Sequence, residues 1–230
     1  MPAESDEEDR GGRPHRRTRR AGRPNEKVIA AGMVVEASLK LIDRDGLDRF
    51  SVHGVARDLG VTAPSIYYHF GNQAALLASV VRHILHEVPL HTDDDDWENV
   101  VVRASIATRR AILRHPNAAP LLLRFLPRHF QLRSYDRAAQ VCPLPVQWHA
   151  RAIEGVEQLT LAASLLAAAS VAAHRPLSPE FDSGRYPSLS RALSVNCLTA
   201  EQRLEANLRA FMKSLRAEVV ESVATIGPAA

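Results

Sequence analysis

Four ring-bearing side chains follow one another in a short segment, residues 59–72, which reads LGVTAPSIYYHFGN. The rings belong to Tyr67, Tyr68, His69 and Phe70. If the segment forms a helix, Phe70 shares a face with Ile66 because the two are four residues apart. The tyrosines and His69 then lie on or beside the outer face, where hydroxyl and imidazole groups can bond phosphates. Small neighbouring side chains suit contacts with thymine methyl groups, so the segment indicates DNA recognition.

Two short helices with a tight turn between them would position these side chains. Ser51 is a good N-cap for a helix over residues 52–59. Gly60 permits the sharp turn, and Thr62 can cap the helix that carries the rings. Pro64 is tolerated there because amides of the first turn have no partner within the helix. In this interpretation, Tyr67, Ala63 and Pro64 lie on the helix face opposite Ile66 and Phe70 and point outward.

A longer helix is predicted on each side of this pair. The first ends at Gly46 and carries an apolar stripe at helical spacing: Ile29, Met33, Ala37 and Leu41. Gly71 ends the ring-bearing helix, and Asn72 can cap the next one. Its stripe consists of Leu77, Val80, Val81, Ile84, Leu85 and Val88. His83, His86 and Glu87 on that helix suggest an ordinary solvated face, since no fourth metal ligand is indicated.

The remaining sequence also predicts helices, and no alternating strand pattern is present. Helices are expected over about 97–114, briefly after 116, and over 146–174 and 199–225, while 120–145 is ill defined. The aspartates of 93–96 would cap the helix that starts at Trp97. Residues 159–173 are apolar on every side, and the last helix carries a single stripe: Leu204, Leu208, Phe211, Leu215 and Val219. We interpret both helices as interface material.

Several function classes are disfavoured. The sequence has no nucleophile elbow, glycine-rich phosphate loop or paired-carboxylate spacing, so an enzyme is the weakest class. Its two cysteines, Cys142 and Cys197, lack metal-ligand spacing and favour a reducing compartment. No leader of basic then apolar residues opens the chain, and residues 159–173 fall short of the roughly 20 residues that span a bilayer. We expect a cytoplasmic protein without metal, cofactor or membrane partner.

The segment FSVHGVARDLGVTAPSIYYHFGNQAALL resembles the DNA-binding region of the TetR family of bacterial transcriptional regulators. The match covers residues 27–85 without a gap and is closest to the tetracycline-repressor type. It implies an all-α homodimer with a helix-turn-helix domain of three helices, which binds a palindromic operator in double-stranded DNA. By matching position, the expected DNA contacts are Ser51, His53, Thr62, Ala63, Pro64, Ser65, Tyr67, Tyr68, His69 and Gln73. The family commonly has a phosphate-binding lysine where this chain has Gln73.

The resemblance continues more weakly through RRAILRHPN, YPSLSRAL and EQRLEANLRAFMKSL. It implies a DNA-binding domain over 25–71 and a larger helical domain over 72–230 that binds a small effector and dimerises. Residues 1–24 lack apolar periodicity and are rich in Arg, Gly and Pro, so we interpret them as a disordered basic arm. Drug-binding relatives carry a magnesium-binding histidine where Leu122 stands here, so a metal-bound effector is not expected. The effector residues are unknown. Trp148, His149, Phe125, Phe130, Tyr135 and His174 belong to the core, and some of them line the cavity in this interpretation.

Two alternatives stay open. An activator, or a regulator that needs no ligand, would carry the same DNA-binding segment with a cavity-free second domain. A helical small-molecule-binding protein without DNA binding is the other alternative. Three departures suggest it: Gln73, Gly54 within the second helix, and Ala63 where a polar base-reading residue could stand.

The arginine-rich stretch within residues 1–24 gives a testable expectation. If its arginines follow the DNA backbone, deletion of 1–24 lowers operator affinity and flattens its dependence on salt, because fewer counterions are released on binding. Gel shifts at several salt concentrations measure the slope. An unchanged slope would mean that the arm makes no contact with DNA.

Overall fold

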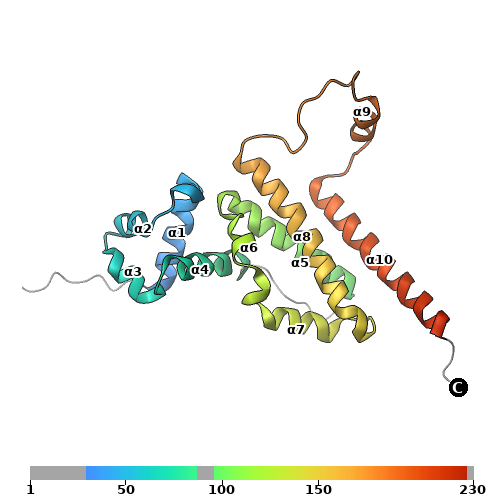
Figure 1. The fold of residues 1–230 in the computed structure, drawn as a ribbon, viewed down its shortest axis with the longest axis horizontal. Helices are drawn as coiled ribbons and strands as arrows, with labels where there is room; N and C mark the ends of the chain where they lie inside the picture. The colour runs from blue at the N-terminus through green and yellow to red at the C-terminus, as the bar shows by residue number, and fades with distance from the viewer. Residues whose placement is uncertain (1–29, 87–95, 227–230) are drawn as a thin grey trace, which may run out of the picture.

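The computed structural model describes residues 30–86 and 96–226, and within these ranges the chain forms helices and no strand (Figure 1). The predicted all-α fold is confirmed. The basic arm, Ile29, Glu87, Val88 and the first three aspartates of 93–96 lie outside the described residues.

Three helices gather at one end of the molecule, and a fourth leads from them towards its centre (Figure 1). They are α1 (Ala31–Asp45), α2 (Val52–Leu59), α3 (Ala63–Phe70) and α4 (Gln73–His86), with a 3-10 turn, η1, at Leu47–Arg49. The bounds of α2 and α3 agree with the sequence prediction. On α4, the described members of the predicted stripe are all buried.

The buried face of α1 differs from the prediction. Met33 was placed on the core stripe, but it is 52% exposed. The buried residues are Val34, Val35, Ser38, Leu39, Leu41 and Ile42. Compared with the predicted stripe, the buried face is shifted by about one residue towards the C-terminus, because Val34 and Val35 are both buried.

The larger helical part follows from α5 onward. Its helices are α5 (Trp97–Arg114), α6 (Leu121–Arg124), α7 (Leu132–Val141), α8 (His149–Ala172), α9 (Pro187–Ser194) and α10 (Ala200–Ile226). Short 3-10 turns lie at Pro116–Ala118 (η2), Pro127–His129 (η3) and Val146–Trp148 (η4). Asp96 caps α5 as expected, accepting a hydrogen bond from the amide of Glu98. The sequence prediction contained neither α7 nor α9.

The apolar stripe of α10 is buried inside its own chain, which corrects its interpretation as interface material. Leu204, Leu208 and Met212 form a core with residues of α5 and α8, and Leu215 joins a second small core. Figure 1 shows α10 alongside α8, with α9 at the far end of the segment that joins them. Any partner would therefore meet other faces of these two helices.

The predicted domain boundary between residues 71 and 72 falls at a turn, but the core continues across it. Leu77 and Val80 of α4 belong to the same buried cluster as Val34 of α1 and Ile66 of α3. A second connection joins the end of α1 to the turn after α5. There, His115 Nδ1 lies 2.7 Å from Asp43 Oδ2, and Asn117 donates a hydrogen bond of 2.9 Å to the carbonyl oxygen of Asp43.

One stretch of the described chain, Val146–Ala172, is long and apolar enough to cross a membrane by length and composition. It is longer than the apolar run of residues 159–173. Core helices of soluble proteins meet the same criterion, but they are mostly buried, whereas 22% of this apolar stretch is buried. Within the chain, α8 packs against α5 and α10.

Candidate nucleic-acid interface and pocket

Side-chain caps and one left-handed glycine fix the angle between α2 and α3. Ser51 Oγ accepts a hydrogen bond from the amide of Gly54 at 3.1 Å, which caps α2. Gly60 ends α2 with φ 67° and ψ 37°, a conformation that residues with a Cβ seldom adopt. Thr62 then caps α3, accepting from the amide of Ser65 at 3.4 Å. These local interactions set the orientation of α3 relative to α2.

The outer face of α3 is exposed and carries the rings that the sequence singled out. Tyr68 is 88% exposed and Tyr67 37% exposed, whereas Ile66 on the opposite face is fully buried. The rings of Tyr68 and His69 meet edge to face with their centroids 5.6 Å apart. Among the other expected contacts, Ser51, His53, Thr62, Pro64 and Gln73 are exposed and Ser65 is half-buried. Contact of these residues with DNA stays a prediction.

Ala63 is the exception, because its side chain is 8% exposed and belongs to the core. The prediction that it faces outward is wrong. Ala63 precedes Ile66 by three residues, and residues three apart on a helix share a face. Ser65 is also less free than expected, since its hydroxyl lies 2.8 Å from that of Thr62 in a shared hydrogen bond.

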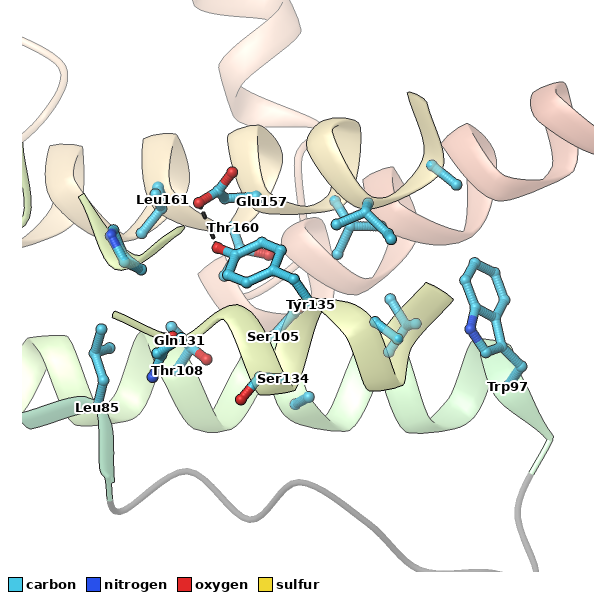
Figure 2. A pocket seen from close by; sticks show the side chains of 17 residues that line it. Leu85, Trp97, Ser105, Thr108, Gln131, Ser134, Tyr135, Glu157, Thr160 and Leu161 are labelled. Carbon is cyan, nitrogen blue, oxygen red and sulfur yellow. Dashed lines mark hydrogen bonds between the residues drawn. The ribbon is translucent and has the colours of Figure 1, made fainter. Parts of the chain in front are cut away.

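A pocket of about 200 Å³ lies within the larger helical part, between α5, α7 and α8 (Figure 2). Leu85, in the last turn of α4, lines one end of it, and Trp97 lies at the other end. Apolar side chains dominate the wall, with a few polar groups among them. The polar lining residues are Ser105, Thr108, Gln131, Ser134, Tyr135, Glu157 and Thr160. Such a wall suits a small, mainly apolar ligand.

The polar side of the pocket is held by a bonded group of three side chains. The Tyr135 hydroxyl donates to Glu157 Oε1 at 2.5 Å, and Arg128 Nε donates to Glu157 Oε2 at 2.5 Å. Burial, followed by the bond to Glu157, raises the pKa of Tyr135 well above its ordinary value. The bond to Glu157 is also the main cause that raises the pKa of Arg128. The phenol therefore stays neutral and the guanidinium stays charged.

Sequence reasoning found only part of this pocket. Of the ring-bearing candidates, Tyr135 lines it, whereas Phe125, Phe130, Trp148, His149 and His174 do not. Leu122 is fully buried in the core and lies outside the lining. Glu157 and Thr160 were missed. Their three-residue spacing on α8 puts them on one face, but the sequence does not indicate that this face meets a cavity.

An exposed helix-turn-helix joined to a larger helical part with a pocket is the architecture of DNA-binding transcriptional regulators. A family model described as bacterial regulatory proteins, tetR family, matches residues 34–80. Over these residues the chain is similar to that family. The tetracycline repressor protein class D from Escherichia coli is 25% identical over 203 residues, which cover 84% of this chain and 92% of that protein.

Two solved structures share the fold over most of their length. A possible TetR family transcriptional regulator from Streptomyces coelicolor A3(2) has a TM-score of 0.69 at 24% identity, covering 82% of this chain and 99% of that one. ActR from Streptomyces coelicolor, solved in complex with actinorhodin, has a TM-score of 0.66 at 20% identity, covering 84% of this chain and 99% of that one.

Proposed function

We propose that the protein is a cytoplasmic repressor rather than an enzyme. Two copies bind a palindromic operator in double-stranded DNA, and a small, mainly apolar molecule releases them. The observation that carries the proposal is the position of α4. Only two residues separate the end of α3 from the start of this helix, and its last turn supplies Leu85 to the pocket. A ligand in the pocket thus touches the same helix that follows the recognition helix.

The length and packing of α4 support this route of coupling. Its 14 residues span about 21 Å at about 1.5 Å per residue. Its buried face contacts both α1 and the larger helical part, so a shift at Leu85 is transmitted through packed side chains. The contact of His115 with Asp43 gives α1 a second attachment to that part. An effector works by binding the DNA-incompetent arrangement more tightly than the competent one.

Exposed apolar surface on α8 supports the homodimer. Leu166 is 61% exposed and Val171 51% exposed, although the stretch around them is strongly apolar. On the neighbouring α10, the small residues Ala206 and Ala210 are exposed beside the buried stripe. Small and apolar side chains allow close helix packing, so this surface suits a second copy of the chain.

Three departures from the family pattern suggested a ligand-binding protein that does not bind DNA. Two of them have a structural explanation. Gly54 is buried, and a Cβ there would lie 3.0 Å from Leu41 Cδ2, so close packing of α1 and α2 explains this glycine. Ala63 is buried in the core, which gives its small side chain a reason in packing. Only Gln73 remains as a departure, and it concerns one phosphate contact.

Footprinting on the DNA flanking the gene for this protein, followed by a metabolite screen for release, tests the proposal. We expect a protected palindrome at moderate salt and at least one apolar metabolite that removes the protection. Absence of a specific complex would exclude the operator-binding function. A complex that no ligand releases would favour the ligand-independent regulator, and increased transcription on binding would favour the activator.

A further inference from the structure

Among the residues that the structure describes, none that lines the pocket is basic. Of its 17 residues, only Tyr135 and Glu157 can ionise, and Tyr135 remains a neutral phenol. An anionic ligand would therefore leave water without finding a cation in the wall. Burial of an unpaired carboxylate or phosphate is unfavourable. The composition of the lining thus discriminates against anions.

The carboxylate of Glu157 is already engaged on both oxygens. Oε1 accepts from Tyr135 and Oε2 from Arg128, and the Glu157 side chain is only 14% exposed. Arg128 Nη1 also donates to Glu154 Oε1 at 2.8 Å, outside the lining. The negative charge that faces the pocket is thus neutralised within the protein. A cationic ligand would have to compete with Arg128 for it, so the pocket does not favour cations either.

Thr160 offers the hydrogen bond that the protein leaves unused. It lies one turn after Glu157 on α8, lines the pocket and is 5% exposed. Its Oγ1 is buried and has no hydrogen-bond partner among the described residues. Because this oxygen is not exposed to the pocket, a ligand bonds it only after the Thr160 side chain rotates. An unpaired buried hydroxyl is destabilising, so a ligand atom that bonds it gains that free energy back. Figure 2 shows Thr160 in the wall near Tyr135 and Glu157.

We propose that the pocket selects an uncharged, mainly apolar molecule that forms a hydrogen bond with the Thr160 hydroxyl, and that it rejects carboxylates and phosphates. The proposal rests on the proposed function, because it takes this pocket as the effector site. Tyr135 and Glu157 form the polar part of the wall, and Arg128, outside the lining, neutralises the charge of Glu157. The remaining contacts are largely apolar, from residues such as Val101, Ile153 and Val156.

Four naphthalene probes of similar size test the selectivity: naphthalene, 1-naphthol, 1-naphthoate and protonated 1-naphthylmethylamine. Calorimetric titration of the full chain at neutral pH, without DNA, gives each affinity. We expect 1-naphthol to bind about 3- to 10-fold more tightly than naphthalene, the value of one hydrogen bond between neutral groups. Both ionic probes should bind more weakly than 1-naphthol. Tightest binding by an ionic probe, or no binding by any probe, would overturn the proposal.

Substitutions at Thr160 assign the hydrogen bond. Thr160→Val keeps the shape of the side chain and should abolish the preference for 1-naphthol while leaving naphthalene affinity unchanged. Ser164→Ala is the matched control on α8, because this hydroxyl is buried outside the lining and donates to the Thr160 carbonyl oxygen. It should preserve the preference. A preference that persists in Thr160→Val would remove this residue from the site.

Substitutions at the two glutamates test the electrostatic part. Glu157→Gln frees the charge of Arg128 towards the pocket and should raise the affinity for 1-naphthoate by about 10-fold. Glu154→Gln removes the other carboxylate bound to Arg128 and should have a smaller effect. Equal effects of the two would contradict the proposed wall. Since no DNA is present, these results bear on the ligand class, whereas footprinting bears on the regulator itself.

Discussion

Tyr67→Ala should abolish operator binding without unfolding the protein. The side chain is 37% exposed on the outer face of α3, and its loss removes no core contact of Ile66 on the inner face. A direct contact to a base or a phosphate is worth about 1–3 kcal/mol. Because a dimer would present two copies, the expected loss is about 2–6 kcal/mol, which removes the complex at ordinary protein concentrations. Gel shifts measure it, and circular dichroism should remain helical.

Tyr186→Ala is the matched control for this substitution. Tyr186 is also an exposed tyrosine, 45% accessible, but it precedes α9 in the larger helical part. Its replacement should leave operator affinity unchanged. If Tyr67→Ala binds the operator as tightly as Tyr186→Ala does, Tyr67 makes no contribution to DNA binding and the face of α3 must be reassigned.

The helix-turn-helix could be predicted closely because its signals are local. Ser51 and Thr62 cap their helices through side-chain bonds to amides three residues on, and Gly60 ends α2 in the left-handed region. Each of these interactions lies within one turn of chain, so the residue type alone indicates it. Ala63 was misassigned because a face was inferred from its small size and not from its spacing to Ile66.

The pocket could not be predicted, because it depends on helices with few local signals. Neither α7 nor α9 has a side-chain cap bond or a buried residue. The first residue of α9, Pro187, is a start signal, but its two leucines, Leu189 and Leu193, are exposed and make too short a pattern to predict a helix. The role of Tyr135 depends on where α7 lies against α8. The stripe of α10 shows the same limit, since an apolar face has the same pattern whether its own chain or a partner covers it.

Gly155→Ala should destabilise the packing of α8 against α10. A Cβ at Gly155 would lie 2.1 Å from Cζ of Phe211 and 2.6 Å from its Cε1, so the ring must move. Overpacking of this kind costs about 1–3 kcal/mol, although alanine gains up to about 1 kcal/mol over glycine in a helix. The net loss should lower the melting temperature by several degrees, at about 2–4 °C per kcal/mol for a chain of this size.

A second glycine and the ring itself separate the clash from the effect of helix propensity. Gly32 lies in α1 with no atom near its built Cβ, so Gly32→Ala should leave the melting temperature unchanged or raise it. Phe211→Leu shortens the opposing side chain. In its presence, Gly155→Ala should cost less than in the native chain, and the difference between the two is the coupling energy of the pair. If the effects of the two substitutions are additive, the added methyl group does not interact with the Phe211 ring. The distance between α8 and α10 would then be set by other contacts.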